Sequence, residues 1–155
     1  MSILKTVKGS PLFYDLYDDE IVQIVETCTV RSLEPGEYIF KDGDEGNEIY
    51  IVLSGNALVK KGEYELARLR KGDLFGELVL LHEKYRNADV ISDNYTDVLI
   101  IEYNTIFKMY ETHPKMFALL ILNLSRLLAK RLKGAGDTIK DLKIELADIN
   151  KKKAA

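Results

Sequence analysis

The hydrophobic residues of this chain follow three successive spacings. Near the N-terminus they recur every three or four residues, at Ile21, Ile24 and Cys28, which is the spacing of one face of a helix. From Thr29 the spacing changes to two, in short runs separated by turns that contain glycine. After residue 103 the helical spacing returns. The pattern predicts a helical lead-in, a central set of strands and a helical C-terminal part.

The lead-in is expected to hold two short helices. Ser10 is a favoured capping residue, and Pro11 suits the first helical position. A second helix is expected to start at Asp18, because the three acidic residues 18–20 suit the positive end of a helix. Residues 1–9 carry no such signal and are expected to form a loose arm.

Seven or eight short strands are expected in the central part. The first expected strand follows Thr29 and ends at residue 33. The others are expected at 38–40, 48–53, 56–61, 64–69, 86 to about 92, and 98–103. Short strands at close, regular spacing favour an antiparallel sandwich or jelly roll over alternating strands and helices. The loop 41–47 is acidic, but its spacing lacks the calcium-loop pattern, so we predict no calcium site there.

The C-terminal part is expected to form a short helix and a long one. Asn104 and Thr105 cap the short helix at 106–111, and the sequence around Pro114 opens the longer one. The stretch 115–133 is rich in leucine. Gly134 and Gly136 then mark either the end of the helix or a weak point in it, because each glycine costs about 1 kcal/mol inside a helix.

An apolar seam follows the long helix through and beyond these glycines. Its members alternate in spacing between three and four, which is a heptad pattern. Such a stripe either packs on the sandwich of the same chain or pairs with a second copy, and we prefer a parallel homodimer. Lys151–Lys153 are interpreted as a solvated helix end. The seam consists of Ile121, Leu128, Leu132, Ala135, Ile139, Leu142, Leu146 and Ile149.

Composition narrows the class of protein. A chain of 155 residues with 46% hydrophobic and 30% charged residues is typical of one globular domain. The net charge of −3 argues against direct binding to DNA. The lone Cys28 cannot form an internal disulfide, and no segment resembles a signal peptide or a membrane span, so we expect a cytoplasmic protein.

Metal and enzyme chemistry are not predicted. A jelly-roll metalloenzyme needs several histidines and carboxylates that converge, and this chain has only His82 and His113. Neither histidine is expected to bind a metal. No nucleophile–base pair stands out, so we predict a non-enzyme without a metal cofactor.

The most informative stretch is 72–90. Gly76 allows a close backbone approach before one turn of helix, whose first N–H groups favour an anion. Arg86 can add a two-pronged contact to phosphate oxygens. Glu77 is unsuited to a bare phosphate but suits a ligand that also presents hydroxyl groups. Together these residues indicate a pocket for a sugar phosphate.

This stretch resembles the phosphate-binding cassette of the cyclic nucleotide-binding domain family. The family occurs in catabolite-activator-type regulators, regulatory subunits of cyclic-nucleotide-dependent kinases and gated channels. The residues that match its pattern run from Phe75 to Leu80 and from Arg86 to Val90. The resemblance implies that Glu77 binds the ribose 2′-hydroxyl and Arg86 the cyclic phosphate of cAMP or cGMP. The candidate binding residues are Phe75, Gly76, Glu77, Leu78, Val79, Arg86, Asn87 and Ala88.

The resemblance also implies an architecture. It covers roughly residues 12–132 and predicts a mainly β jelly-roll sandwich with N-terminal helices, a short cassette helix and a long C-terminal helix. We predict a binding domain at 1–133, with a lead-in at 10–28, a β-roll at 29–103 and helices at 104–133. Residues 134–155 form a dimerising extension. A helix-turn-helix domain is not present in the sequence, so we expect a sensor that signals to another protein through its C-terminal helices.

Four departures from the family pattern keep an alternative open. Val79, Tyr85, Asn87 and Asp89 replace residues that are common in nucleotide binders. Asp89 is expected to face away from Arg86, because residues 86, 88 and 90 share the other face of a strand. Base selectivity stays open, with Asn87 as the only candidate that contributes to it. The alternative function is a ligand-independent interaction module that kept the fold and lost the nucleotide.

Overall fold

The strands form two four-stranded antiparallel sheets that enclose a common core. The computed structural model describes residues 2–81 and 84–155. One sheet has the order β1–β8–β3–β6 and the other β2–β7–β4–β5. The predicted jelly-roll sandwich is therefore confirmed. The strands are β1 (Thr29–Leu33), β2 (Tyr38–Phe40), β3 (Glu48–Ser54), β4 (Ala57–Lys61), β5 (Tyr64–Leu69), β6 (Leu74–Phe75), β7 (Asp89–Ser92) and β8 (Thr96–Glu102).

The central strand β3 divides its side chains between two hydrophobic clusters. Tyr50 and Val52 face the space between the sheets, where they meet apolar residues of both sheets. Ile49 and Ile51 point the other way, into a second cluster formed with the helices. All four are at most 4% exposed. Because successive strand residues point to opposite faces, a strand buried on both sides reads as a continuous apolar run.

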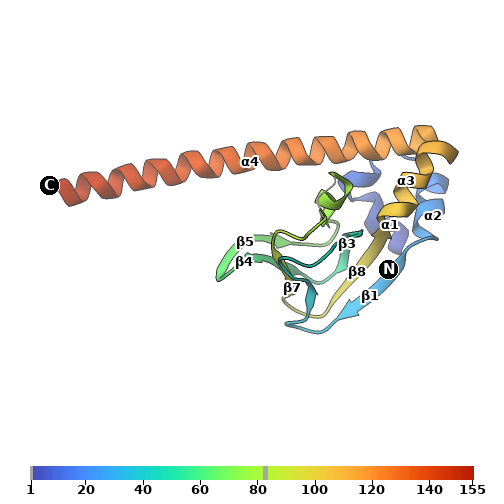
Figure 1. Cartoon of the computed structure of the whole chain (residues 1–155), viewed down its shortest axis with the longest axis horizontal. Coiled ribbons are helices and arrows are strands. Elements are labelled where there is room, and N and C mark those ends of the chain that lie inside the picture. Colours follow the sequence, from blue (N-terminus) through green and yellow to red (C-terminus); the bar gives the residue numbers. More distant parts are fainter. Residues whose placement is uncertain (1, 82–83) are drawn as a thin grey trace.

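Helices cover the outer face of the first sheet. The N-terminal lead-in, α3 and the first turns of α4 gather at one end of the sandwich (Figure 1). In the described part of the cassette, β6 is followed by a short 3₁₀ turn, η2. The helical elements are α1 (Ile3–Lys8), η1 (Pro11–Phe13), α2 (Asp18–Val25), η2 (Glu77–Leu81), α3 (Tyr103–Thr112) and α4 (Pro114–Ala154).

The prediction of a loose N-terminal arm is wrong. Residues 3–8 form the helix α1, and Val7 on this helix is completely buried in the helical cluster. The helix is short and has no side-chain cap, so local signals did not reveal it. Its stability comes from burial of an apolar face against the rest of the domain.

The C-terminal helices differ from the prediction in their bounds. The short helix α3 starts at Tyr103, with Glu102 rather than Asn104 or Thr105 at the capping position. The long helix α4 begins at Pro114 as expected and continues through the two glycines to Ala154. Gly134 and Gly136 have no neighbouring atoms within 4 Å of a hypothetical Cβ, so neither glycine serves a close contact. The proposed domain boundary at residue 133 stays a prediction, and the helix crosses it without a break.

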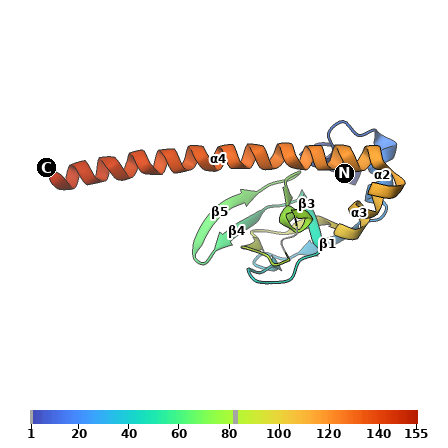
Figure 2. The same ribbon diagram turned by 45° about the horizontal axis from the view of Figure 1, so that its top comes forward.

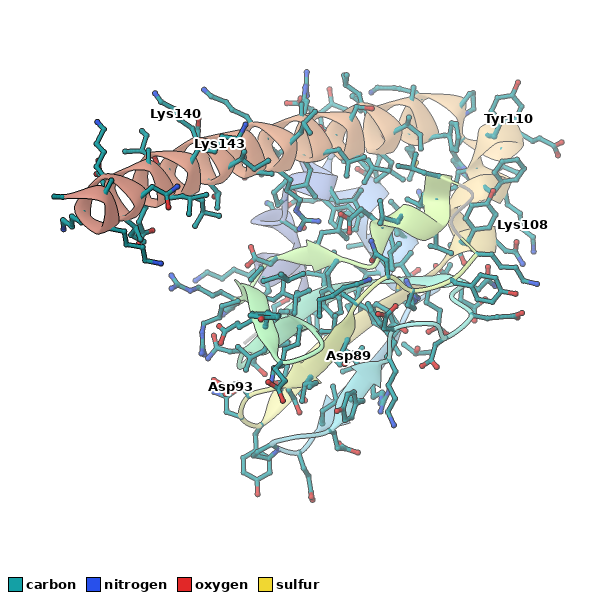
Figure 3. The ribbon with its side chains drawn as sticks, turned by 60° about the vertical axis from the view of Figure 1, so that its left-hand side comes forward. Asp89, Asp93, Lys108, Tyr110, Lys140 and Lys143 are labelled. Atoms are coloured by element: carbon teal, nitrogen blue, oxygen red, sulfur yellow. The ribbon has the colours of Figure 1, made fainter. Side chains whose placement is uncertain are left out.

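The distal half of α4 extends past the sandwich into solvent (Figures 1 and 2). Lys140 and Lys143 project from this part of the helix (Figure 3). Among the described residues, no helix is both long enough and apolar enough to cross a membrane. The distal seam residues do not pack on the sandwich of their own chain: Leu132 is 76% exposed, and Ile139, Leu142, Leu146 and Ile149 are also exposed.

The proximal half of α4 is fastened to the lead-in by one buried amide. Asn123 is 1% exposed, and its Nδ2 donates hydrogen bonds to the carbonyl oxygens of Leu12 (3.0 Å) and Tyr14 (2.6 Å). Its Oδ1 accepts a hydrogen bond from Arg126 (3.2 Å). The side chain therefore satisfies backbone groups of a short 3₁₀ turn that has few bonds of its own.

We expect Asn123→Ala to destabilise the domain by about 1–3 kcal/mol, because a buried carbonyl group and a part-buried one lose their donor. Urea denaturation followed by circular dichroism measures this change. Asn150→Ala is the matched control on the exposed part of the same helix, and it should change stability by less than about 0.7 kcal/mol. Equal midpoints for the two variants would contradict the anchoring role of Asn123.

Candidate functional site

The cassette is shaped by two glycines in the left-handed conformation. Gly72, at φ +91°, turns the chain into β6, and Gly76, at φ +76°, turns it from β6 into η2. A Cβ on Gly76 would lie 2.9 Å from Arg86 Nη1 and 3.2 Å from the Tyr50 ring. Position 76 therefore requires glycine for both its conformation and its space.

Arg86 lies behind this turn and is held by backbone carbonyl groups. Its Nη1 donates to Gly76 O (3.0 Å) and its Nη2 donates to Glu48 O (2.7 Å). The side chain is buried, at 8% exposed. Its guanidinium carbon lies 4.3 Å from the centre of the Phe40 ring and 5.6 Å from that of Tyr50. These contacts fix the orientation of the guanidinium and restrict its movement.

The charge of Arg86 has no acidic partner within the described residues. Its hydrogen bonds go to neutral carbonyl groups, and it forms none of the ion pairs between described residues. Its Nε is buried and has no hydrogen-bond partner. A buried cation without an anion is costly, and so is a buried donor without an acceptor. The arrangement therefore suits an anionic ligand.

Tyr50 lies next to the Arg86 guanidinium and is kept in its neutral form. Burial raises the pKa of the Tyr50 hydroxyl above its ordinary value, and the hydrogen bond and negative charge of Glu48 raise it further. Its hydroxyl donates to Glu48 Oε2 (2.6 Å), and its ring stacks on Phe75 with centres 5.1 Å apart. A neutral tyrosine leaves Arg86 free to interact with a ligand.

Backbone hydrogen bonds connect the acidic loop 41–47 to the segment that carries Arg86. Gly43 N donates to Arg86 O (2.8 Å), and Arg86 N donates to Asp44 O (2.7 Å). A Cβ on Gly46 would overlap the Arg86 guanidinium, so this glycine belongs to the site although its role was not predicted. Asp42 N also donates to Asp89 Oδ1 (2.8 Å). The loop thus positions the arginine through its backbone.

Glu77 is paired with an arginine from the long helix. The Arg131 guanidinium donates from Nη1 to Glu77 Oε1 and from Nη2 to Leu74 O. Glu77 is 6% exposed, whereas Arg131 is half-buried. This contact joins residues 54 positions apart in the sequence and connects α4 directly to the cassette.

One cavity of about 290 Å³ lies between the second sheet, the cassette and α4. It brings together all eight residues predicted from the sequence: Phe75, Gly76, Glu77, Leu78, Val79, Arg86, Asn87 and Ala88. Their roles toward a nucleotide stay predictions. Its lining combines the charged residues Glu77, Arg86 and Arg131 with many apolar side chains. The chemistry suits a ligand with an anionic, hydroxylated part and a flat apolar part.

Seven further residues of the cavity wall were missed. They are Phe40, Val59, Ala67, Leu69, Tyr85, Val90 and Arg131. Strand alternation had placed Val90 on the same face as Arg86, and the same argument applied to β4 and β5 would have found Val59, Ala67 and Leu69. No local signal identifies Arg131, because it lies on a helix far along the sequence.

Three departures from the family pattern have structural consequences that can now be described. Val79 lines the cavity and also packs against the helical cluster, and the cavity persists beside it. Asn87 is exposed at the rim, where its backbone carbonyl oxygen accepts a hydrogen bond from Lys61 Nζ (2.7 Å). Asp89 is absent from the cavity wall and faces the loop 41–47, as strand alternation predicted (Figure 3).

The histidines bear on the metal prediction in different ways. His82 lies outside the described residues. His113 is exposed at the start of α4, and its Nδ1 lies 3.0 Å from Thr112 Oγ1. Within residues 2–81 and 84–155, no group of three or more His, Cys, Asp or Glu side chains is placed to hold a metal ion.

Comparison with known proteins finds relatives by sequence and by structure. The chain is 33% identical over 145 residues to the cyclic AMP receptor protein of Thermus thermophilus, a match that covers 90% of this chain and 63% of that protein. It is 41% identical over 73 residues to a cGMP-dependent protein kinase of Toxoplasma gondii, covering 47% of this chain and 7% of the kinase. The chain therefore spans less than two thirds of these relatives.

The fold is also shared with solved structures. The structure of a cyclic nucleotide-binding domain from Methylobacillus flagellatus superposes with a TM-score of 0.78 at 20% identity, covering 88% of this chain and 80% of that one. The family model of the cyclic nucleotide-binding domain matches residues 30–113, which include both sheets and the cassette. By its fold, its cassette and this match, the chain belongs to the cyclic nucleotide-binding domain family.

Proposed function

We propose that this chain is a regulatory module that binds a cyclic nucleoside monophosphate. The observation that carries the proposal is the buried Arg86, which lines the cavity, whose charge has no acidic partner among the described residues and whose Nε has no hydrogen-bond partner. A phosphate at this position supplies both a counter-charge and hydrogen-bond acceptors. We propose no catalytic activity and no metal cofactor.

The remaining groups of the cavity fit the other parts of such a ligand. Glu77 offers a carboxylate that can accept a hydrogen bond from a ribose hydroxyl, and the first amide groups of η2 complete an anion cradle. Apolar side chains of β4, β5 and β7 face the volume left for a base. Because these walls are largely aliphatic, they do not distinguish cAMP from cGMP, and Asn87 at the rim stays the candidate for selectivity.

The proposed signal passes through Arg131. In this structure the Glu77 carboxylate, which is proposed to bind the ribose, already accepts a hydrogen bond from α4. A ligand hydroxyl at Glu77 therefore rearranges the contact on which the position of α4 depends. The ligand shifts α4 only to the extent that it binds the two arrangements with different affinities. The receiver of this signal is proposed to be a second copy of the chain or another, still unidentified, cytoplasmic protein.

The distal part of α4 is the proposed site of homodimerisation. Leu132, Ile139, Leu142, Leu146 and Ile149 form an exposed apolar seam on a helix that extends past the sandwich. Exposed leucines and isoleucines at heptad spacing are buried when two helices pair. We propose a parallel coiled coil, which places the two binding domains on the same end of the pair.

We expect isothermal titration calorimetry to show micromolar binding of cAMP or cGMP. The nucleotide with the lower dissociation constant identifies the preferred base. Arg86→Ala should weaken this binding by at least about 30-fold, because a buried phosphate loses its charged partner. Arg70→Ala removes an exposed arginine and is the matched control, with an expected change below about twofold. Circular dichroism confirms that each variant is folded. If neither nucleotide binds at millimolar concentration, the ligand-independent interaction module becomes the preferred function.

We expect Arg131→Ala to uncouple α4 from the cavity, since the helix then loses its contact with Glu77. Spin labels at Tyr64→Cys and Lys140→Cys, in a Cys28→Ser background, report the distance between the β4–β5 hairpin and α4. Arg131→Ala should broaden the unliganded distance distribution and reduce the nucleotide-dependent change by about half or more. Lys130→Ala, at an exposed neighbouring position, should behave like the parent protein. Identical distributions for both variants would exclude Arg131 as the coupling contact.

We expect Leu142→Glu to disrupt the dimer. Each helix loses a leucine from the seam and gains a charge there, so the dimer dissociation constant should rise at least about 100-fold. Ile144→Glu is the matched control, because Ile144 is similarly exposed, at 52% against 58%, but lies off the seam. Analytical ultracentrifugation at tens of micromolar measures both. A monomeric parent protein would overturn the proposal, and so would equal dissociation of the two variants.

A further inference from the structure

A second cavity lies outside the cassette, where three helices meet. It has a volume of about 300 Å³ and is lined by α2, α3 and the first turn of α4. None of the residues of the nucleotide cavity belongs to it. Its lining residues are Gln23, Ile24, Thr27, Thr105, Lys108, Met109, Thr112, His113 and Met116.

The floor of this cavity is apolar. Ile24, Met109 and Met116 line it, and because they are 2%, 7% and 4% exposed, this side of the cavity is continuous with the helical core. Methionine side chains are flexible and polarisable, and they adapt to apolar ligands of different shape. This floor suits a short hydrocarbon chain.

The rim of the cavity carries hydrogen-bond donors and a positive charge. Lys108 forms none of the ion pairs found between described residues, and it projects from α3 at the end of the molecule away from the free end of α4 (Figure 3). The Thr105 hydroxyl and the Gln23 amide also have no hydrogen-bond partner in the described part of the chain. By contrast, Thr27 and Thr112 donate to Ile24 O and Lys108 O.

No carboxylate is among the residues that line this cavity. Lys108 is exposed and belongs to a lining that otherwise offers hydroxyl, amide and imidazole groups but no carboxylate. A ligand that supplies a carboxylate can pair with Lys108 and accept hydrogen bonds from Thr105 and Gln23. An apolar tail on the same ligand would cover the methionine floor.

We infer that this cavity binds a small amphipathic carboxylate, with its acid group at Lys108 and its hydrocarbon tail on Met109 and Met116. The inference does not depend on nucleotide binding, because the two cavities share no residue. The site lies at the junction between α3 and α4, so its occupant contacts the first turn of α4.

The test uses octanoate as the probe, with amide and methyl resonances of the full chain followed by NMR in the absence of nucleotide. Octanoate should cause saturable shifts at Thr105, Lys108 and Met116, with a dissociation constant of about 1 mM. Octylammonium, which has a similar tail and the opposite charge, and acetate, which lacks the tail, should cause no saturable shift there.

Two lysine variants separate a specific contact from general attraction to a charged surface. Lys108→Gln should weaken octanoate binding about tenfold, as expected for loss of one charge-assisted contact. Lys143→Gln, on the exposed part of α4, should leave it unchanged (Figure 3). Arg86→Ala should also leave it unchanged, which distinguishes this site from the nucleotide cavity.

Three results would overturn the inference. One is the absence of saturable shifts at the three lining residues. Another is equal weakening by Lys108→Gln and Lys143→Gln. The third is a loss of octanoate binding in Arg86→Ala, which would assign the probe to the nucleotide cavity instead.

Discussion

The arrangement of the domain centres on a buried arginine that has carbonyl groups and aromatic rings around it but no described acid beside it. Arg86 is held from three directions, by Gly76 O, by Glu48 O and by the loop that bonds its own backbone. Each of these elements must keep its position for the guanidinium to stay aimed at the cavity. Glycines at 46 and 76 follow from the same constraint, since any side chain there would collide with it. A bound anion would offset the cost of burying this charge.

The long helix is attached to the domain at two points of different character. Asn123 is fully buried and bonded to backbone groups of the lead-in, so it acts as a fixed anchor. Arg131, eight residues further on, makes a half-buried ion pair with Glu77 at the wall of the cavity. A contact at the cavity wall is the one that a ligand can alter, whereas the anchor does not face the cavity. Movement is therefore expected in the part of α4 beyond Asn123, which includes the exposed seam.

The two cavities have different chemistry although their volumes are similar. The first combines Arg86, Glu77 and Arg131 with aliphatic walls, so it suits a ligand that carries both an anion and hydroxyl groups. The second has one lysine, several hydroxyl groups and no acid among its lining residues. Both adjoin α4, one near its middle and the other at its first turn. An occupant of either site would therefore contact α4.

The features that rest on local rules could be predicted from the sequence. Period-two alternation predicted the strands and the outward direction of Asp89, and the cassette pattern predicted the eight residues that meet at the cavity. Tertiary structure decided the rest. The helix α1 forms because Val7 is buried. The helix α4 continues through its two glycines because the helical residues on both sides outweigh the cost of the glycines. The pairing of Arg131 with Glu77 depends on the placement of α4 over the cassette, and contacts between residues so far apart leave no trace in local spacing.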